Sequence, residues 1–133
     1  MASWQLELHE PPQGDRELEL WLQHATGRIL FEDVRGYAID RIEQALSAEA
    51  HAAAKKGIDD ALYGLMMVLD GVTGALANET QRVELAVQAR LVNRSPEKIV
   101  VELDLKDGDG MCMGYHGWLE GNYGEDPVVV RKP

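Results

Sequence analysis

Cysteine, proline and long apolar runs are scarce in this sequence, and each shortage excludes a class of protein. The single cysteine, Cys112, leaves no internal disulfide, which excludes a disulfide-built secreted fold and is compatible with a reducing compartment. Five prolines among 133 residues exclude a collagen-like or proline-rich chain. The longest uncharged apolar run, 61–69, is too short for a membrane span. The first residues lack a basic region followed by an apolar stretch, so no signal peptide is expected.

Familiar catalytic and cofactor motifs are also missing from the sequence. It contains no GxGxxG, GxxxxGK[ST], HExxH or GxSxG pattern, and no set of cysteines and histidines with zinc spacing. The paired acids at 17/19 and 32/33 are weak candidates for acid–base catalysis, because neighbours at such spacings do not share a helix face. The sequence therefore favours a protein that is not an enzyme, without excluding one, and no cofactor or metal is expected.

The charge is strongly unbalanced, with 13 basic against 23 acidic residues and a net charge of −10. Such a chain is not expected to bind nucleic acid or an anionic membrane, whereas a basic partner suits it. Hydrophobic residues make up 45% and charged residues 27%, which is ordinary for a globular protein. We expect one soluble cytoplasmic domain spanning residues 1–133.

Helical periodicity dominates the first half of the chain. Alternation over Trp4–Leu8 predicts a short strand that ends at the Pro11-Pro12-Gln13-Gly14 turn. Residues 15–25 fit both a strand and a helix, and helix is preferred, ending near Gly27. Two further helices are predicted, over 31–56 with Gly57 as its stop, and over 58–70 with Asp70-Gly71 as its stop.

Alternation with a period of two dominates the second half. Residues 83–92 and 99–105 predict an antiparallel hairpin around a turn at 93–97. After a second turn at 107–110, residues 111–119 are expected to return as a third strand, and 127–130 either add an edge strand or trail without pairing. The predicted fold class is α+β, with two layers in which N-terminal helices pack on an antiparallel β-meander.

The acidic end of the chain is the main candidate site. Residues 101–126 hold seven acids and one base, together with aromatic side chains of the kind found in protein-binding hot spots. The alternative is a solvated strand face with Trp118 packed in the core. The candidate partner-binding residues are Glu102, Asp104, Asp107, Asp109, Tyr115, His116, Trp118, Glu120 and Tyr123.

Three functional hypotheses follow. The first is a non-catalytic acidic module that binds a basic protein, most specifically an inhibitor of the immunity-protein type, since such blockers are small, acidic and without catalytic residues. The second is a small-molecule-binding domain or minor enzyme with a pocket between helices and sheet. This pocket would lie near Met66, Met67, Met111, Met113 and Trp118. The third is a structural homodimer built on the 58–70 helix.

Smaller motifs favour structural explanations. Asp107-Gly108-Asp109-Gly110 resembles part of an EF-hand loop, but aligning Gly110 with its glycine puts Leu105 and His116 at ligand positions, so a β-turn is preferred. Cys112 and His116 would lie about 13 Å apart along a strand, which is too far for a nucleophile–base pair. The other histidines, His9, His24 and His51, share no spacing.

Two features of the 58–70 helix are left open. Asp70 is preferred as the first residue of an Asp-Gly turn, although a carboxylate at a helix C-terminus also marks a functional position. Gly64, Val68 and Gly71 place small residues on one side of the helix. This side packs either within the same chain or against a second copy.

Overall fold

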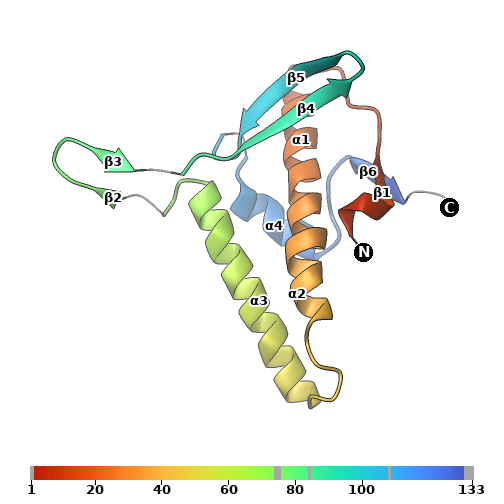
Figure 1. Ribbon diagram of the computed structural model, residues 1–133, viewed down its shortest axis with the longest axis vertical. Helices are drawn as coiled ribbons and strands as arrows, with labels where there is room; N and C mark the ends of the chain where they lie inside the picture. Colours follow the sequence, from red (N-terminus) through yellow and green to blue (C-terminus); the bar gives the residue numbers. More distant parts are fainter. Residues whose placement is uncertain (1, 74–75, 84, 108, 131–133) are drawn as a thin grey trace.

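The computed structural model describes residues 2–73, 76–83, 85–107 and 109–130, and it confirms the α+β class. Two long helical segments form an open hairpin, a short helix crosses behind the first of them, and pairs of strands lie around this frame (Figure 1). Glu84 and Gly108, which belong to two of the predicted elements, lie outside the described residues. Within the described ranges, no helix is long and apolar enough to cross a membrane.

The first helix is longer than the sequence predicts. Helix α1 (Asp15–Leu30) continues through a π-helical segment, η2 (Phe31–Gly36), into α2 (Tyr37–Asp40). The predicted end near Gly27 is wrong because this glycine lies inside α1, where the indole of Trp118 crosses it. A Cβ at Gly27 would lie 2.2 Å from the Trp118 ring. Gly27 therefore permits close packing and does not end the helix.

The predicted helices over 31–56 and 58–70 are divided at the wrong place. The chain leaves α2 after Asp40, and α3 (Ala48–Leu69) runs without interruption through Gly57. Ser47 begins α3, since its side chain accepts a hydrogen bond from the Ala50 amide at 3.1 Å. A glycine inside a helix costs only about 1 kcal/mol relative to alanine. Gly57 therefore weakens α3 slightly but does not end it. The end at Asp70 is confirmed, with Gly71 in the left-handed region at φ +74°.

The strands form three separate antiparallel pairs, not a continuous meander. Strand β1 (Leu6–Leu8) pairs with β6 (Val128–Val130), and β2 (Leu76–Ala77) pairs with β3 (Arg82–Val83). The predicted hairpin is confirmed as β4 (Gln88–Arg94) and β5 (Glu97–Asp104), with an irregularity between Leu91 and Val92. The predicted strand over 83–92 is thus divided between two sheets. Its first residues belong to an arm, β2–β3, that projects from the body beside the end of α3 (Figure 1).

The predicted third strand over 111–119 is wrong, because these residues form helix α4 (Met111–Leu119). One local and one long-range feature start the helix. Gly110 turns the chain with φ +90°, and the carboxylate of Asp70 accepts hydrogen bonds from the backbone amides of Met111 and Cys112, the latter at 2.8 Å. Glycine is a poor helix former, but a Cβ at Gly114 would lie 2.6 Å from the Trp118 ring. This glycine lets the large indole fold back over its own helix.

The core lies where α1, α3 and α4 meet. Its main cluster includes Leu62 and Met66 from α3, with Leu105 just after β5, and its largest side chain is Trp118 from α4. A smaller cluster of Trp21, Leu22 and Leu103 joins α1 to the β4–β5 hairpin. Both clusters share α1, which therefore has the hairpin against its first half and α4 against its second.

Candidate functional site

The three aromatic rings expected at an exposed docking surface are buried. Tyr115, Trp118 and Tyr123 are 2%, 1% and 4% exposed, and the Trp118 and Tyr123 rings stack with centroids 6.2 Å apart. The expectation of exposed rings is wrong because residues 111–119 form a helix, which turns Tyr115 and Trp118 together toward the core. These rings stabilise the fold and are not available to a partner.

The acids expected beside those rings do not form one patch either. Glu102 lies on β5, on the opposite side of the strand from buried Leu103, and pairs with Arg90 at 3.6 Å. Asp104 accepts a hydrogen bond from the Lys106 amide at 3.1 Å, while Asp107 is exposed in the following turn and Glu120 follows α4. Among the candidate acids, only Asp109 makes a described side-chain contact with α1.

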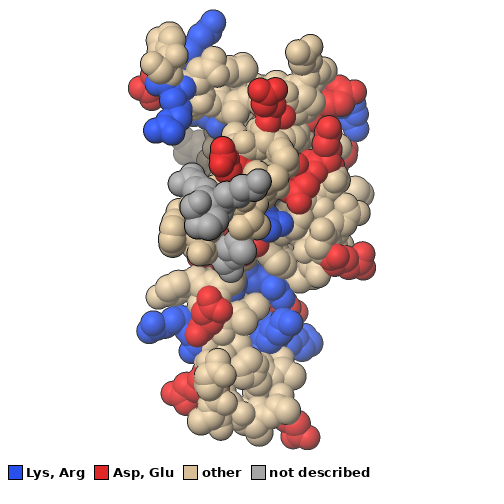
Figure 2. Space-filling model, turned by 90° about the vertical axis from the view of Figure 1, so that its right-hand side faces the viewer, with Lys and Arg blue, Asp and Glu red and all other residues tan. Residues whose placement is uncertain are grey.

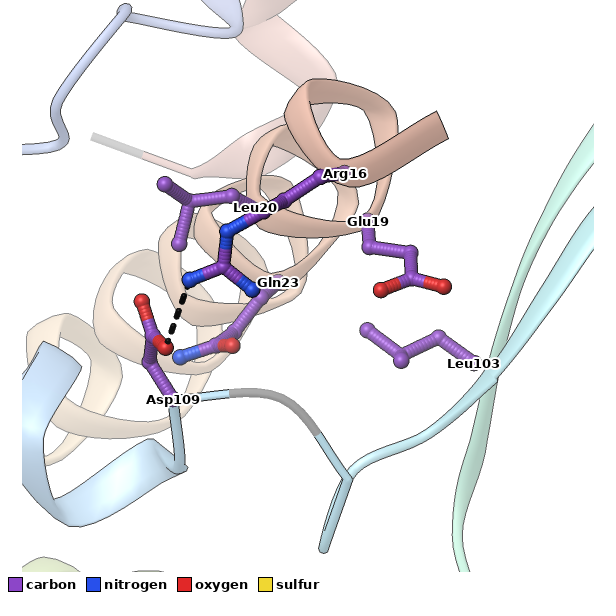
Figure 3. Close-up of a pocket in the computed structure, with 6 residues that line it drawn as sticks. All are labelled: Arg16, Glu19, Leu20, Gln23, Leu103 and Asp109. Atoms are coloured by element: carbon purple, nitrogen blue, oxygen red, sulfur yellow. Dashed lines mark hydrogen bonds and ion pairs between the residues drawn. The ribbon is translucent and has the colours of Figure 1, made fainter. Parts of the chain in front are cut away.

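A different group of acids meets around the first half of α1. Asp109 reaches this helix from the loop before α4, and its carboxylate pairs with Arg16 at 3.3 Å. Figure 3 shows Arg16, Leu20 and Gln23 along α1, with Asp109 facing them. These side chains, with Glu19 and Leu103, surround a small hollow of about 10 Å³. A single water fits such a volume, and a metabolite does not.

A second hollow adjoins the first across Leu20, which lines both of them. Its volume is about 80 Å³. The residues that line it include Glu17 and His24 on α1 and Glu125 on the loop after α4. Asp126 follows Glu125 and acts electrostatically on His24, as Asp109 does. We call the five exposed acids of this region the α1 acidic surface. Its members are Glu17, Glu19, Asp109, Glu125 and Asp126.

Two partly buried hydrogen bonds hold the segments around the α1 acidic surface in place. Gln23 is 2% exposed, and its amide donates to the carbonyl of Gly110 at 2.7 Å, which fixes the loop that carries Asp109. The indole N–H of Trp118 donates to Nδ1 of His24 at 3.0 Å, which fixes α4 against α1. The acids therefore stand on a rigid frame, although their own side chains are in solvent.

His24 is the titratable group at the base of this surface. Burial lowers its pKa below the usual 6.5, and the negative charges of Asp109 and Asp126 oppose this shift. An indole N–H can only donate, so Nδ1 of His24 must be unprotonated to accept it. The folded structure therefore favours the neutral imidazole.

Cys112 and His116 are brought closer together than the predicted strand would allow. Both lie on α4 one turn apart, and the ring of Tyr63 on α3 lies 5.5 Å from that of His116. Burial raises the pKa of the Cys112 thiol, and a hydrogen bond to Asp70 raises it further. The thiol is therefore kept protonated, which disfavours a role as nucleophile.

The methionines around which a pocket was expected do not line either of the hollows beside α1. Met66 and Met111 are 0% exposed and pack in the core, and Met113 is on the surface of α4. Throughout the described ranges, no three side chains of His, Cys, Asp or Glu come together as metal ligands.

Comparisons found no match to a protein-family model, a curated protein or a solved structure. Function must therefore be inferred from the surface of the molecule. Sequence reasoning missed Glu17 and Glu19 as site residues, because the segments that meet them lie about 90 to 110 positions further along the chain. Their spacing alone carries no sign of those contacts.

Proposed function

We propose that this protein is a non-catalytic module that binds a basic protein through the α1 acidic surface. The observation that carries the proposal is the convergence of acids from three separate segments, 17–19, 109 and 125–126, on one half of α1. Arg16 is the basic residue seen among them, and Asp109 pairs with it. The surface therefore presents an excess of negative charge.

The small hollows favour a macromolecular partner over a metabolite. Volumes of about 10 and 80 Å³ are well below those of small-molecule sites, whereas each hollow suits the end of one side chain. Lysine or arginine side chains of a partner would pair with the carboxylates at the rims. Charges at the rim of an interface raise the association rate more than they lengthen the lifetime of the complex.

The distribution of charge on one face of the molecule agrees with a directed encounter. Figure 2 shows that acidic side chains gather over part of the upper half of the face in view, whereas several basic side chains lie around its middle. The most specific form of the proposal is an inhibitor that occludes the basic site of a toxin or nuclease. Its mechanism would be steric coverage combined with electrostatic attraction.

The test compares two variants with the same net charge. One neutralises four of the five acids of the α1 acidic surface (Glu17→Gln, Glu19→Gln, Asp109→Asn, Glu125→Gln), and the other neutralises four exposed acids elsewhere (Asp40→Asn, Glu43→Gln, Glu79→Gln, Glu97→Gln). Association with a nona-arginine peptide is measured by stopped-flow fluorescence at 20 and 150 mM salt.

The wild type and the second variant should associate at least about 10-fold faster at the lower salt concentration than at the higher. The first variant should lose most of this dependence. Equal losses in the two variants would show that net charge alone attracts the peptide, and the α1 acidic surface would then have no special role.

A further inference from the structure

The α3 helix carries an apolar stripe that its own chain leaves partly uncovered. Its members recur with alternating spacings of four and three residues, which is the a/d pattern of helices that pack against one another. Ala61 and Leu65 are exposed, the latter by 37%, and the others are half-buried. We call this stripe the α3 seam. It consists of Ala54, Ile58, Ala61, Leu65 and Val68.

The α3 seam forms one wall of a groove between the two arms of the helical hairpin. Val34 of η2 and Ala38 of α2 form the opposite wall, and the volume of the groove is about 220 Å³. Arg35 is the charged residue that lines it, and Asp59 neutralises the guanidinium at 2.5 Å. The groove therefore presents apolar surface, with its one charge already paired.

The area of the molecule indicates how much of its surface a partner would cover. A folded monomer of this length is expected to expose about 7,000 Å², whereas this chain exposes 9338 Å². The excess is therefore about 2,300 Å² on this scaling. The projecting β2–β3 arm contributes to this excess, so about 4,600 Å² is the upper bound on the interface that two copies could share, and permanent homodimers need about 2,000 Å² or more.

A second copy fits the seam better than an unrelated partner does. The seam has no charged or hydrogen-bonding side chain that would select a different protein, and an a/d stripe packs best against another a/d stripe. Gly57 and Gly64 lie beside it, and a Cβ at either position would meet no atom within 4 Å. Their small size lets the axis of a second helix approach closely.

The negative charge of the chain does not prevent this pairing. The α1 acidic surface lies near residues 17–24 of the first helix, whereas the groove lies at 34–38. At 1.5 Å per residue the two regions are about 25 Å apart, which is roughly three Debye lengths at physiological salt. At this distance, salt screens most of the repulsion between the acidic surface of one copy and charges at the groove.

We propose that the protein forms a two-fold symmetric homodimer in which the α3 seam of each copy packs against that of the other and closes both grooves. The two helical hairpins then complete a four-helix arrangement. The α1 acidic surface of each copy stays exposed at the far end. The dimer does not depend on a basic partner, so it can be tested separately from the proposed function.

The first test is sedimentation equilibrium of the full chain from 1 to 100 µM. The wild type should have twice the protomer mass at the higher concentrations. Leu65→Glu should weaken the dimer by on the order of 100-fold or more, because it buries an unpaired carboxylate in the seam. The matched control is Leu119→Glu on α4, where the wild-type leucine is 41% exposed, and this variant should remain dimeric.

The second test places a cysteine at the centre of the seam. Ala61 lies midway between Ala54 and Val68, so two-fold packing brings it near its own copy whether the helices run parallel or antiparallel. In a Cys112→Ser background, Ala61→Cys should cross-link rapidly on mild oxidation, and Ala52→Cys, on the opposite side of α3, should not. A wild type that stays monomeric at 100 µM, or equal cross-linking of the two cysteine variants, would overturn the proposal.

Discussion

Asp70 is the single residue on which the start of α4 depends most. Its carboxylate accepts hydrogen bonds from the first two amides of α4, where the helix dipole favours a negative charge. It also lies at the end of α3, so one side chain joins two helices. The preferred interpretation, an Asp-Gly turn, is correct for the backbone, and the carboxylate has in addition the structural role of capping α4.

Replacing Asp70 with alanine should lower the free energy of unfolding by about 1–3 kcal/mol, because the amides of Met111 and Cys112 lose their acceptor. Asp70→Asn keeps one acceptor oxygen and should lose less. Urea unfolding measures both changes. Asp107→Ala, at an exposed position, is the control and should change stability by less than about 0.5 kcal/mol. Equal effects of the Asp70 and Asp107 variants would refute the capping role.

His24 is a second single residue with an effect on stability, because its titration makes the free energy of unfolding depend on pH. Since burial lowers its pKa in the folded state below 6.5, the unfolded chain binds a proton first as the pH falls. The contribution of neutral His24 is therefore complete above pH 6.5 and is lost as the pH falls from there toward the folded pKa. His24→Asn keeps an acceptor for the Trp118 indole but does not titrate.

We expect urea midpoints of the wild type to fall more steeply between pH 7 and pH 5 than those of His24→Asn. The carboxylates contribute a slope common to both proteins, so the difference between them isolates His24. Parallel slopes would contradict the assignment of a neutral imidazole to the folded state.

At the scale of elements, the helix at 111–119 is the sharpest departure from the sequence prediction. This segment was expected to return as a third strand, yet its glycines, Gly114 and Gly117, both lie in α4, and Gly114 packs beneath the Trp118 indole. The contacts that decide the outcome come from Asp70 and from Gly27, which lie more than 40 positions away. Local pattern alone cannot show them.

Met113 offers a direct test of this helix, because it is 71% exposed and packing has little influence there. In a helix, Met113→Ala should be more stable than Met113→Thr by about 0.5 kcal/mol. In a strand the order would be reversed, since threonine is the better strand former. Urea midpoints of the two variants decide between the structures.

The elements that sequence reasoning predicted correctly are those with strong local patterns. The β4–β5 hairpin follows from strict alternation on both sides of a turn, and the end of α3 follows from Asp70-Gly71. The predicted helix boundaries at Gly27 and Gly57 were wrong. Gly27 lies inside α1 and makes room for Trp118, and Gly57 lies inside α3, which continues through it. Helix stops and packing glycines look identical in a sequence.

At the scale of the whole molecule, the sequence predicted that the candidate site would be acidic but did not predict most of the residues that form it. The excess of acid is readable from composition, but the set of acids that meets on α1 depends on how two distant loops fold back. Tyr115, Trp118 and Tyr123 were candidates for the surface because aromatic anchors suit an interface, and the alternative, Trp118 in the core, is the one that the structure confirms. They suit a core equally well, and in this protein they fill it.

The pairing of β1 with β6 ties together two segments from near opposite ends of the sequence. Leu6, Glu7 and Leu8 pair with Val130, Val129 and Val128. The chain between these two strands therefore forms a closed loop. A mechanical force applied to β1 is therefore transmitted to β6 through the hydrogen bonds between the two strands. Attaching a surface or a fusion partner at either end places it beside the same short ladder.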